Sequence, residues 1–327
     1  MKIFIYATRT FDELDHAKAA SEKYGIEFDY THEYPTMENA HLAQGCDAIS
    51  FTPCDMGKEM IEQFHKMGVR YLLARSVGFE HIDLKAAKKC GMRVCTTYYN
   101  ADCVANYAIM LMLMCTRRIT HILKRSEVQD YSLKGKLGIE ISNCKVGIIG
   151  TGNIGKTVIK HLSGFGCEIY ANDAYENDEV KKYAKYVPLE TLYKECDIIS
   201  LHAPSNKETY HMINKKALDM MKDGVIIVNT ARGTLIDTDA LIEAIESGKV
   251  SSAGLDVIED ENGLYYYNRM GDAIPNRQMA QLRSYPHVIM SPHTAFYTDD
   301  SVREMIEHNF EGLYAFEQSG QYEHELV

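Results

Sequence analysis

The 327-residue chain lacks several features that mark whole classes of protein. It has no run of ~18 uninterrupted apolar residues, so no transmembrane helix is expected. Its first ten residues, MKIFIYATRT, predict a β-strand and lack the apolar core and small-residue cleavage site of a signal peptide. We find no low-complexity tract and no short internal repeat. The absences point to a globular protein of the cytoplasm.

Basic charge and cysteine motifs are also scarce. The formal net charge is −11, which argues against nucleic acid and anionic membranes as partners, because both bind basic patches. The nine cysteines are odd in number, and no two are spaced as C-x-x-C. Cys95 and Cys167 lie in apolar runs, as buried free thiols of a reducing compartment do. A chain of this length needs neither disulfides nor a structural metal, and we expect no metal site.

The length favours about two domains. Short apolar runs alternate with amphipathic stretches, which predicts doubly wound parallel sheets of the α/β class. In the first hundred residues the expected strands are Lys2–Tyr6, Ala48–Phe51, Tyr71–Ala74 and Arg93–Cys95, and the expected helices are Phe11–Tyr24, Gly57–Met67 and Leu84–Lys89.

A long helical pattern spans residues 101–125 and is rich in methionine, at Met110, Met112 and Met114. Methionine fills irregular apolar gaps, so packing is the expected role of all three. The domain break is placed near residue 100.

A second alternation follows this helix. Its expected strands are Lys145–Ile149, Cys167–Ala171, Ile198–Leu201, Val225–Val228, Ala253–Val257 and Val288–Met290. The last helix begins at Ser301 and ends at about Gln318. Composition alone does not decide whether this helix returns to the first domain.

A strand at residues 145–149 runs into Gly150-Thr-Gly152-Asn-Ile-Gly155 and then a helix. In this G-x-G-x-x-G pattern, Gly150 permits a tight turn, Gly152 lets the backbone approach a pyrophosphate, and Gly155 allows helix and strand to pack closely. The helix N-terminus offers unpaired N–H groups to the phosphates. The pattern is weak alone, but its strand and helix context predicts a dinucleotide site.

The next strand ends at Asp173, roughly 20 positions beyond the motif, where a carboxylate can bind the adenosine ribose. The same carboxylate would repel the 2′-phosphate of NADP, so NAD is the expected cofactor. Two further strand ends, Leu201–Pro204 and Val228–Gly233, should face it, because ligands bind at the carboxyl ends of strands.

Other residues suit hydride transfer to a carbonyl. Arg232 follows a strand, and arginine can hold a carboxylate through two bonds. His293, in Ser-Pro-His-Thr-Ala, is a candidate proton donor. A carboxylate should hold its ring, and spacing leaves Glu259, Asp260 and Glu261 as alternatives. The turn Arg75-Ser-Val-Gly78 offers backbone N–H groups to an anion.

Together these residues resemble the D-2-hydroxyacid dehydrogenase family, in particular its D-lactate dehydrogenases, including the vancomycin-resistance type. The resemblance covers nearly the whole chain. It is carried by Arg75-Ser-Val-Gly-Phe-Glu-His-Ile-Asp83, Gly150–Gly155, Val228-Asn-Thr-Ala-Arg-Gly-Thr-Leu-Ile-Asp237, Gly254-Leu-Asp-Val-Ile-Glu-Asp-Glu261 and Ser291-Pro-His-Thr-Ala-Phe-Tyr-Thr298.

The resemblance implies roles for individual residues. Arg232 binds the substrate carboxylate, His293 is the acid/base, and Glu261 is its partner. Val77 and Gly78 offer backbone N–H groups to the substrate, and Tyr99 and Phe51 line its pocket. Cofactor contacts are implied for Gly150, Gly152, Asn153, Ile154, Gly155, Asp173, Ala203, Pro204, Thr230, Ala231 and Asp256, and less securely for Thr209.

The resemblance also implies an architecture. A Rossmann NAD-binding domain, residues 101–298, is inserted into a flavodoxin-like substrate domain made of residues 1–100 and 299–327. A homodimer forms around the long helix after residue 100. One departure concerns Tyr99-Asn-Ala-Asp102, where the family usually reads Tyr-Ser-Pro-Asn, so the loop loses a proline.

The expected activity is reduction of a small 2-oxo acid, pyruvate first, to the (R)-2-hydroxy acid, because aromatic Phe51 fills volume that a longer substrate would need. Reduction of 2-oxoisocaproate or an arylpyruvate is the nearest alternative. An alternative of another class is a non-catalytic NAD(H)-sensing module. The complete set of Arg232, Glu261 and His293 favours an enzyme.

Overall fold

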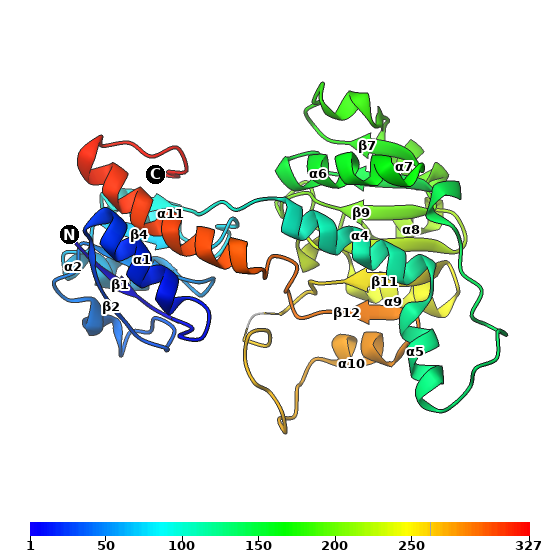
Figure 1. Ribbon diagram of the computed structural model, residues 1–327, viewed down its shortest axis with the longest axis horizontal. Coiled ribbons are helices and arrows are strands. Elements are labelled where there is room, and N and C mark those ends of the chain that lie inside the picture. Colours follow the sequence, from blue (N-terminus) through cyan, green and yellow to red (C-terminus); the bar gives the residue numbers. More distant parts are fainter. Residues whose placement is uncertain (262) are drawn as a thin grey trace. The chain divides into compact units, whose positions relative to one another are not determined.

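A computed structural model describes residues 1–261 and 263–327. The chain divides into two compact units (Figure 1). Unit 1 comprises Met1–Asn100 and Tyr297–Val327, and unit 2 comprises Ala101–Phe296. Each unit contains one sheet whose named strands pair in parallel. Of the helices in the described residues, none is long and apolar enough to cross a membrane.

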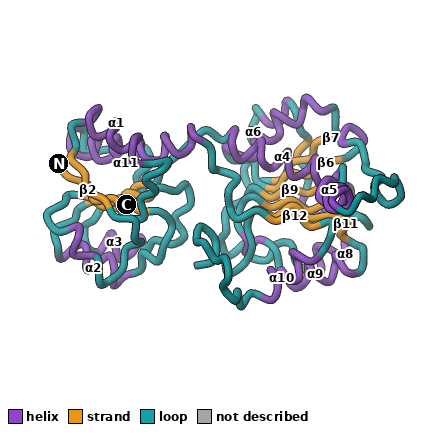
Figure 2. The backbone as a smooth tube through the Cα atoms, turned by 60° about the horizontal axis from the view of Figure 1, so that its bottom comes forward, coloured by secondary structure: helices purple, strands orange, loops and turns teal. Residues whose placement is uncertain are grey.

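Unit 1 has the strand order β2-β1-β3-β4-β5, which is the flavodoxin-like order. Helices α1 and α11 cover one face of this sheet and α2 and α3 cover the other (Figure 2). The elements are β1 (Lys2–Ile5), α1 (Leu14–Tyr24), β2 (Glu27–Tyr30), β3 (Ala48–Phe51), α2 (Lys58–Lys66), β4 (Tyr71–Ala74), α3 (Leu84–Lys89), β5 (Arg93–Cys95) and α11 (Asp299–Gln318).

Helix α11 joins unit 1 because of its apolar stripe. Ile306, Phe310, Leu313 and Phe316 recur at helical spacing and are buried in one cluster with residues of β1 and β4. The last residues of the chain then pair with β5, where Leu326 N donates to Val94 O at 2.8 Å. This added pairing covers the free edge of β5.

Unit 2 has the strand order β12-β11-β10-β9-β6-β7-β8. Counted from β6 as the first strand this is 3-2-1-4-5-6 with one further strand, the Rossmann arrangement. The predicted fold class is therefore confirmed. The elements are α4 (Asp102–Thr116), α5 (Ile119–Glu127), β6 (Lys145–Ile149), α6 (Asn153–Leu162), β7 (Glu168–Asn172), β8 (Lys185–Tyr186), α7 (Leu189–Glu195), β9 (Ile198–Leu201), α8 (Lys215–Met220), β10 (Val225–Asn229), α9 (Thr238–Glu246), β11 (Val250–Leu255), α10 (Arg277–Ser284) and β12 (Val288–Met290).

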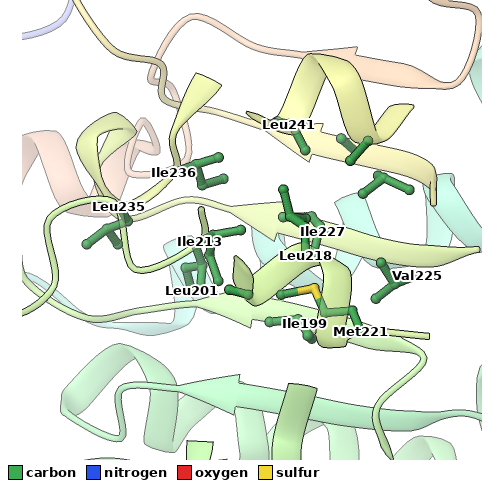
Figure 3. Close-up of a cluster of buried hydrophobic side chains, with 14 of the residues drawn as sticks. Ile199, Leu201, Ile213, Leu218, Met221, Val225, Ile227, Leu235, Ile236 and Leu241 are labelled. Atoms are coloured by element: carbon green, nitrogen blue, oxygen red, sulfur yellow. The ribbon is translucent and has the colours of Figure 1, made fainter. Parts of the chain in front are cut away.

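The core of unit 2 lies on both faces of its sheet. On one face, Ile199 and Ile227 from the central strands pack with Leu218 from α8, Met221 directly after α8, and Leu241 from α9 (Figure 3). A second cluster joins the strands to α4 and α6. All five residues of β10 are buried, as expected for a parallel strand covered on both sides.

The prediction of one long helix over residues 101–125 is wrong in one respect. The structure breaks it into α4 and α5, because Arg118 adopts a left-handed conformation with φ 52°. Met112 is fully buried, as its packing role requires, whereas Met110 is 39% exposed on the surface of α4.

Two short edge strands, β2 and β8, were absent from the sequence prediction. Strand β2 has only four residues, EFDY, and most of them are exposed; its alternation of polar and apolar residues is a short strand signal that the sequence prediction missed. Helix α1 also begins later than expected, at Leu14, and Phe11 remains 80% exposed in the preceding turn.

Candidate active site

The carboxyl ends of the unit 2 strands carry most of the predicted site residues. Three of these ends are linked by backbone hydrogen bonds. Asp256 N, after β11, donates to Asn229 O of β10 at 2.9 Å, and His293 N, after β12, donates to Asp256 O at 2.8 Å. The segments that carry Arg232, Glu261 and His293 therefore start from one connected edge.

His293 lies in a turn that Asp256 organises. Asp256 is fully buried, and its carboxylate accepts from Ser291 Oγ at 2.6 Å, Thr294 N at 3.0 Å and Ala295 N at 2.9 Å. Within this turn His293 adopts φ 53°, a left-handed conformation that non-glycine residues rarely keep without such support. Asp256, predicted as a cofactor contact, is thus seen to fix the histidine's backbone.

The imidazole of His293 faces Glu261. Its Nδ1 lies 2.6 Å from Glu261 Oε1, and Ile258 N donates to the other carboxylate oxygen at 3.0 Å. A carboxylate only accepts, so Nδ1 carries the proton of this bond. This leaves Nε2, on the opposite side of the ring, to exchange a proton with another molecule.

The structure distinguishes the three acids that spacing left as alternatives for the partner of His293. Glu261 contacts His293, whereas Glu259 contacts His211 at 2.6 Å. Asp260, between them, is exposed with φ 55°. The structure therefore brings together the histidine and the acid that the family resemblance implied.

Arg232 extends from the segment after β10. Buried Asn229 fixes this segment, accepting from Ala231 N at 3.0 Å and donating through Nδ2 to Arg232 O at 2.8 Å. The next residue, Gly233, packs so tightly that a Cβ would lie 2.0 Å from the carbonyl carbon of Ile258. The arginine is thus held at its main chain on both sides.

The glycine-rich turn fits a dinucleotide. Gly150 has φ +93°, and a Cβ there would lie 2.6 Å from the backbone of His202. A Cβ on Gly155 would lie 1.9 Å from Gly150 O, so only glycine lets α6 begin this close to β6. At Gly152 no described atom lies within 4 Å of a Cβ position, which leaves room for a pyrophosphate. Asn153, Ile154 and Gly155 then form the first turn of α6.

Asp173, at the end of β7, is tied to this turn. Thr151 donates to Asp173 Oδ2 through its backbone N at 2.6 Å and through Oγ1 at 3.2 Å. The hydroxyl of Tyr186 lies 2.8 Å from Thr151 Oγ1 and accepts from Asn177 N at 3.0 Å. A chain of donors therefore runs from Asn177 through Tyr186 and Thr151 to the carboxylate. Sequence reasoning did not find Tyr186, because it lies in the unpredicted strand β8.

Two polar groups near the remaining cofactor positions are also informative. Thr230 Oγ1, at the end of β10, is buried and has no hydrogen-bond partner in the part of the chain that the structure describes, as suits a group awaiting a ligand. His202, before Ala203 and Pro204, bonds Ser200 Oγ through Nε2 at 2.9 Å. Burial lowers the pKa of His202 to about 4, so its ring is neutral at pH 7. Thr209 donates to Pro204 O at 2.6 Å and shapes that loop.

The predicted substrate residues of unit 1 follow its strand ends. Val77 is 45% exposed in the turn after β4, where Ser76 Oγ donates to Gly78 O at 2.7 Å. Tyr99, in the segment that departs from the family pattern, is half-buried. Phe51, the last residue of β3, is fully buried with its ring edge-on to His81 at 6.1 Å.

Arg75 has a structural task in unit 1. Its guanidinium is buried and donates to Ser50 Oγ at 2.9 Å and Tyr6 O at 2.7 Å, with Glu13 3.4 Å away. Burial lowers the pKa of Arg75, against the raising effect of Glu13. The side chain thus joins the ends of β1, β3 and β4.

Among residues 1–261 and 263–327, no three His, Cys, Asp or Glu side chains are grouped to hold a metal ion.

Comparison with known proteins places this geometry in a family. Residues 109–295 match the model described as D-isomer specific 2-hydroxyacid dehydrogenase, NAD binding domain. The chain is 42% identical over 323 residues to an aromatic 2-oxoacid reductase of Clostridium sporogenes, covering 98% of this chain and 97% of that protein. It is 34% identical over 330 residues to a D-lactate dehydrogenase of Escherichia coli K12, covering all of both.

A solved D-2-hydroxyisocaproate dehydrogenase superposes with a TM-score of 0.91 at 31% identity, covering 100% of this chain and 99% of that one. These matches confirm the predicted enzyme class and cofactor against the alternative of a non-catalytic NAD(H) sensor. The chain belongs to the D-isomer-specific 2-hydroxyacid dehydrogenase family of NAD-dependent oxidoreductases.

Proposed function

We propose that this enzyme reduces a small 2-oxo acid to the (R)-2-hydroxy acid and that Arg232, His293 and Glu261 carry the reaction. The single observation that supports this most is the 2.6 Å contact between His293 Nδ1 and Glu261. It creates an acid/base with one nitrogen free for the substrate, on the same sheet edge as Arg232.

In the proposed mechanism the guanidinium of Arg232 binds the substrate carboxylate through two parallel N–H bonds. His293 donates its Nε2 proton to the carbonyl oxygen as that oxygen gains charge. Glu261 stabilises the imidazolium before this transfer and keeps the ring oriented. NADH, when bound at the glycine-rich turn, supplies the hydride that the carbonyl carbon receives. One proton and one hydride thus convert the 2-oxo acid to the alcohol, and solvent restores the proton of His293.

Pyruvate is the first-choice substrate. Phe51 is a fully buried aromatic residue at the end of β3, and its ring takes up volume that an aliphatic residue would leave for a longer substrate side chain. The test is a panel of pyruvate, 2-oxoisocaproate and phenylpyruvate with NADH, with chiral analysis of the product. Pyruvate should give the highest kcat/KM, and Phe51→Leu should shift the ratio towards 2-oxoisocaproate. A wild type that prefers either larger acid would contradict the assignment.

A second candidate substrate class is the arylpyruvates. Two rings flank His293 in unit 2, with Tyr266 at 5.9 Å and Phe296 at 6.4 Å between ring centroids. Aromatic faces attract one another at such spacing. The Clostridium sporogenes relative is also named for aromatic 2-oxo acids. If this candidate is right, phenylpyruvate will lead the panel and Tyr266→Ala will reduce its advantage over pyruvate.

We further propose that Asp173 selects NADH over NADPH. Its carboxylate is fixed by Thr151 and by Tyr175 N at 3.0 Å, in the position where the sequence pattern expects the adenosine ribose. Comparable kcat/KM values with NADH and NADPH would contradict this role.

A second copy of the chain is the proposed partner. Helix α5 has no buried residue, and the segment after it exposes Val128 (76%), Tyr131 (75%), Leu133 (87%) and Leu137 (85%). We call residues 119–139 the apolar arm. Exposed apolar surface of this extent marks an interaction site, and a homodimer would bury it.

Light scattering after size-exclusion chromatography tests the dimer. The wild type should have twice the mass of one chain, and the double variant Leu133→Asp with Leu137→Asp should dissociate. Phe11→Asp is the matched control, because Phe11 is equally exposed at 80% but lies in unit 1. A monomeric wild type would refute the proposal.

All nine cysteines are free, which supports the cytoplasm as the site of action.

A further inference from the structure

The acidic loop after β11 carries a second histidine–carboxylate contact beside the one at His293. Glu259 accepts from His211 Nε2 at 2.6 Å, from Thr238 Oγ1 at 2.6 Å and from Thr238 N at 3.1 Å. The side chains of His211 and Glu259 are only 28% and 17% exposed. We call the three residues His211, Glu259 and Thr238 the latch.

Each member of the latch belongs to a different segment of the sheet edge. His211 lies in the segment between β9 and α8, Thr238 begins α9 beyond Arg232, and Glu259 precedes Glu261 by two residues. The latch therefore joins the segment of the predicted cofactor contacts, the segment of Arg232 and the segment of Glu261.

Backbone contacts show that the segments are packed directly on one another. His211 N donates to Thr234 O at 2.9 Å, and Ile213 N donates to Leu235 O at 3.0 Å. A Cβ on Gly233 would lie 2.4 Å from Glu259 N. The loop between Arg232 and α9 is thus enclosed by the other two segments.

The ring of His211 is itself held in place. Tyr210 stacks on it with centroids 4.0 Å apart and planes at 14°. His211 also adopts φ 50°, which aims a side chain differently from an extended residue. With its ring fixed, His211 presents Nε2 to a single carboxylate oxygen.

We propose that His211 and Glu259 are positioning residues, which set the place of Arg232 relative to Glu261 through Thr238. The inference rests on the proposed function, because it assigns their effect to the catalytic set of that function. Neither residue is assigned a contact with the substrate. Glu259 acts through the loop of residues 233–238 on one side and through Ile258–Glu261 on the other.

The physical reason is the precision that the reaction demands. A displacement of ~1 Å in a group that binds substrate can cost about 100-fold in rate. Arg232 is held at its main chain by Asn229, and the loop beyond it is bonded to the segment of His211 through Thr234 O and Leu235 O. The far end of the loop needs a fixed point of its own. Glu259 fixes that end at the first residue of α9, through both the hydroxyl and the N–H of Thr238.

The test compares Glu259→Gln, His211→Gln and the double variant in the full-length enzyme. The substrate is the 2-oxo acid that the wild type reduces fastest, so the choice of substrate does not affect the outcome. The control is Glu243→Gln, which removes the contact of Glu243 with Lys215 at 2.8 Å between two neighbouring helices of the same unit. KM, kcat, the Kd for NADH from fluorescence and the Tm are measured, with kinetics taken well below every Tm.

Each single variant should raise KM for the 2-oxo acid about 10-fold and lower kcat a few-fold. The Kd for NADH should stay within about twofold of the wild type, because the glycine-rich turn and Asp173 lie on other strands. Because the two residues act as one contact, the double variant should be no worse than about the worse single variant. Thr238→Val, which removes only a hydroxyl, should show the same KM effect at about threefold, and it keeps the test available if a Glu259 variant does not fold.

A lower Tm with unchanged KM and kcat would show that the latch is only a structural contact and would overturn the proposal. The proposal would also be overturned if the effects of the two single variants on KM multiplied in the double variant. An active wild type whose variants match Glu243→Gln refutes the latch alone. A folded wild type that reduces no 2-oxo acid refutes the proposed function and the latch with it.

Discussion

Replacing Glu261 by glutamine isolates the charge beside the proposed proton donor. Glutamine keeps the size of the side chain and an acceptor for Ile258 N, but it removes the negative charge 2.6 Å from His293 Nδ1. Both side chains are mostly shielded, at 26% and 20% exposure. A hydrogen bond to a charged group contributes about 1.5–3 kcal/mol in such a setting. Each 1.36 kcal/mol is a factor of ten in rate, so kcat/KM for reduction should fall by about 10- to 100-fold.

The loss follows from what Glu261 does for the ring. In reduction His293 donates a proton, and the amide of glutamine has no charge to balance the imidazolium that makes this donation. Oxidation of the hydroxy acid uses the same ring as the proton acceptor and depends on the same contact. If the affinity for the cofactor is unchanged, kcat/KM should fall by the same factor in both directions, because the equilibrium constant of the reaction does not change.

The assay follows NADH absorbance and gives kcat/KM in each direction at one fixed pH. Asp260→Asn is the matched control, because it removes a charge from the same loop that is exposed to solvent, and an exposed charge has little effect. An unchanged kcat/KM in Glu261→Gln, or an equal loss in Asp260→Asn, would refute the assignment of Glu261.

Three further predictions use other parts of the structure. Arg232→Lys should raise KM for the 2-oxo acid by at least about 10-fold with little effect on NADH affinity, because lysine lacks the planar fork; near-normal kcat/KM would contradict the role. Tyr186→Phe removes the hydroxyl that is bonded to Thr151, whose own hydroxyl donates to Asp173. Since a lost hydrogen bond costs about 1 kcal/mol, fluorescence titration should show NADH binding about fivefold weaker. An unchanged Kd would show that this chain of hydrogen bonds is not needed. The pKa of His202 is about 4 in the folded chain against an ordinary value of 6.5, so the stability it contributes is complete above about pH 6.5 and is lost as the pH falls towards 4. Urea unfolding at pH 7 and pH 5 should show about 2 kcal/mol of this loss, and His202→Gln should lose correspondingly less, provided that His202 is neutral as the structure indicates.

The sequence predicted those parts of the fold that produce a strong local pattern. The central strands of unit 2 are continuous apolar runs, and the glycine-rich turn needs glycine at Gly150 and Gly155 for steric reasons that any such turn shares. Strand β2 is not a continuous apolar run, because exposed edge residues do not have to be apolar, and its four alternating residues are a short signal. The break at Arg118 gives no sequence signal, since arginine is otherwise a good helix former.

The candidate site was likewise predicted only where its residues carry a local signal. Residue types and strand ends pointed to Arg232 and His293, but three acids in a row fitted the partner equally well. Choosing among them requires the path of the loop, which turns Glu261 towards His293 and Glu259 towards His211. His211 went unnoticed because its partner is 48 positions away in the sequence. Contacts of this range depend on tertiary structure and leave no local pattern.

Unit 1 is built from two stretches of chain that the ribosome makes at very different times. Its sheet is complete by Cys95, yet one face of that sheet is covered by α1 alone until α11 supplies Ile306, Phe310, Leu313 and Phe316. All of unit 2 is synthesised in between, and it is one continuous stretch with its own core. We expect unit 2 to reach its native state during translation, while this apolar face of unit 1 stays partly exposed until the last helix emerges.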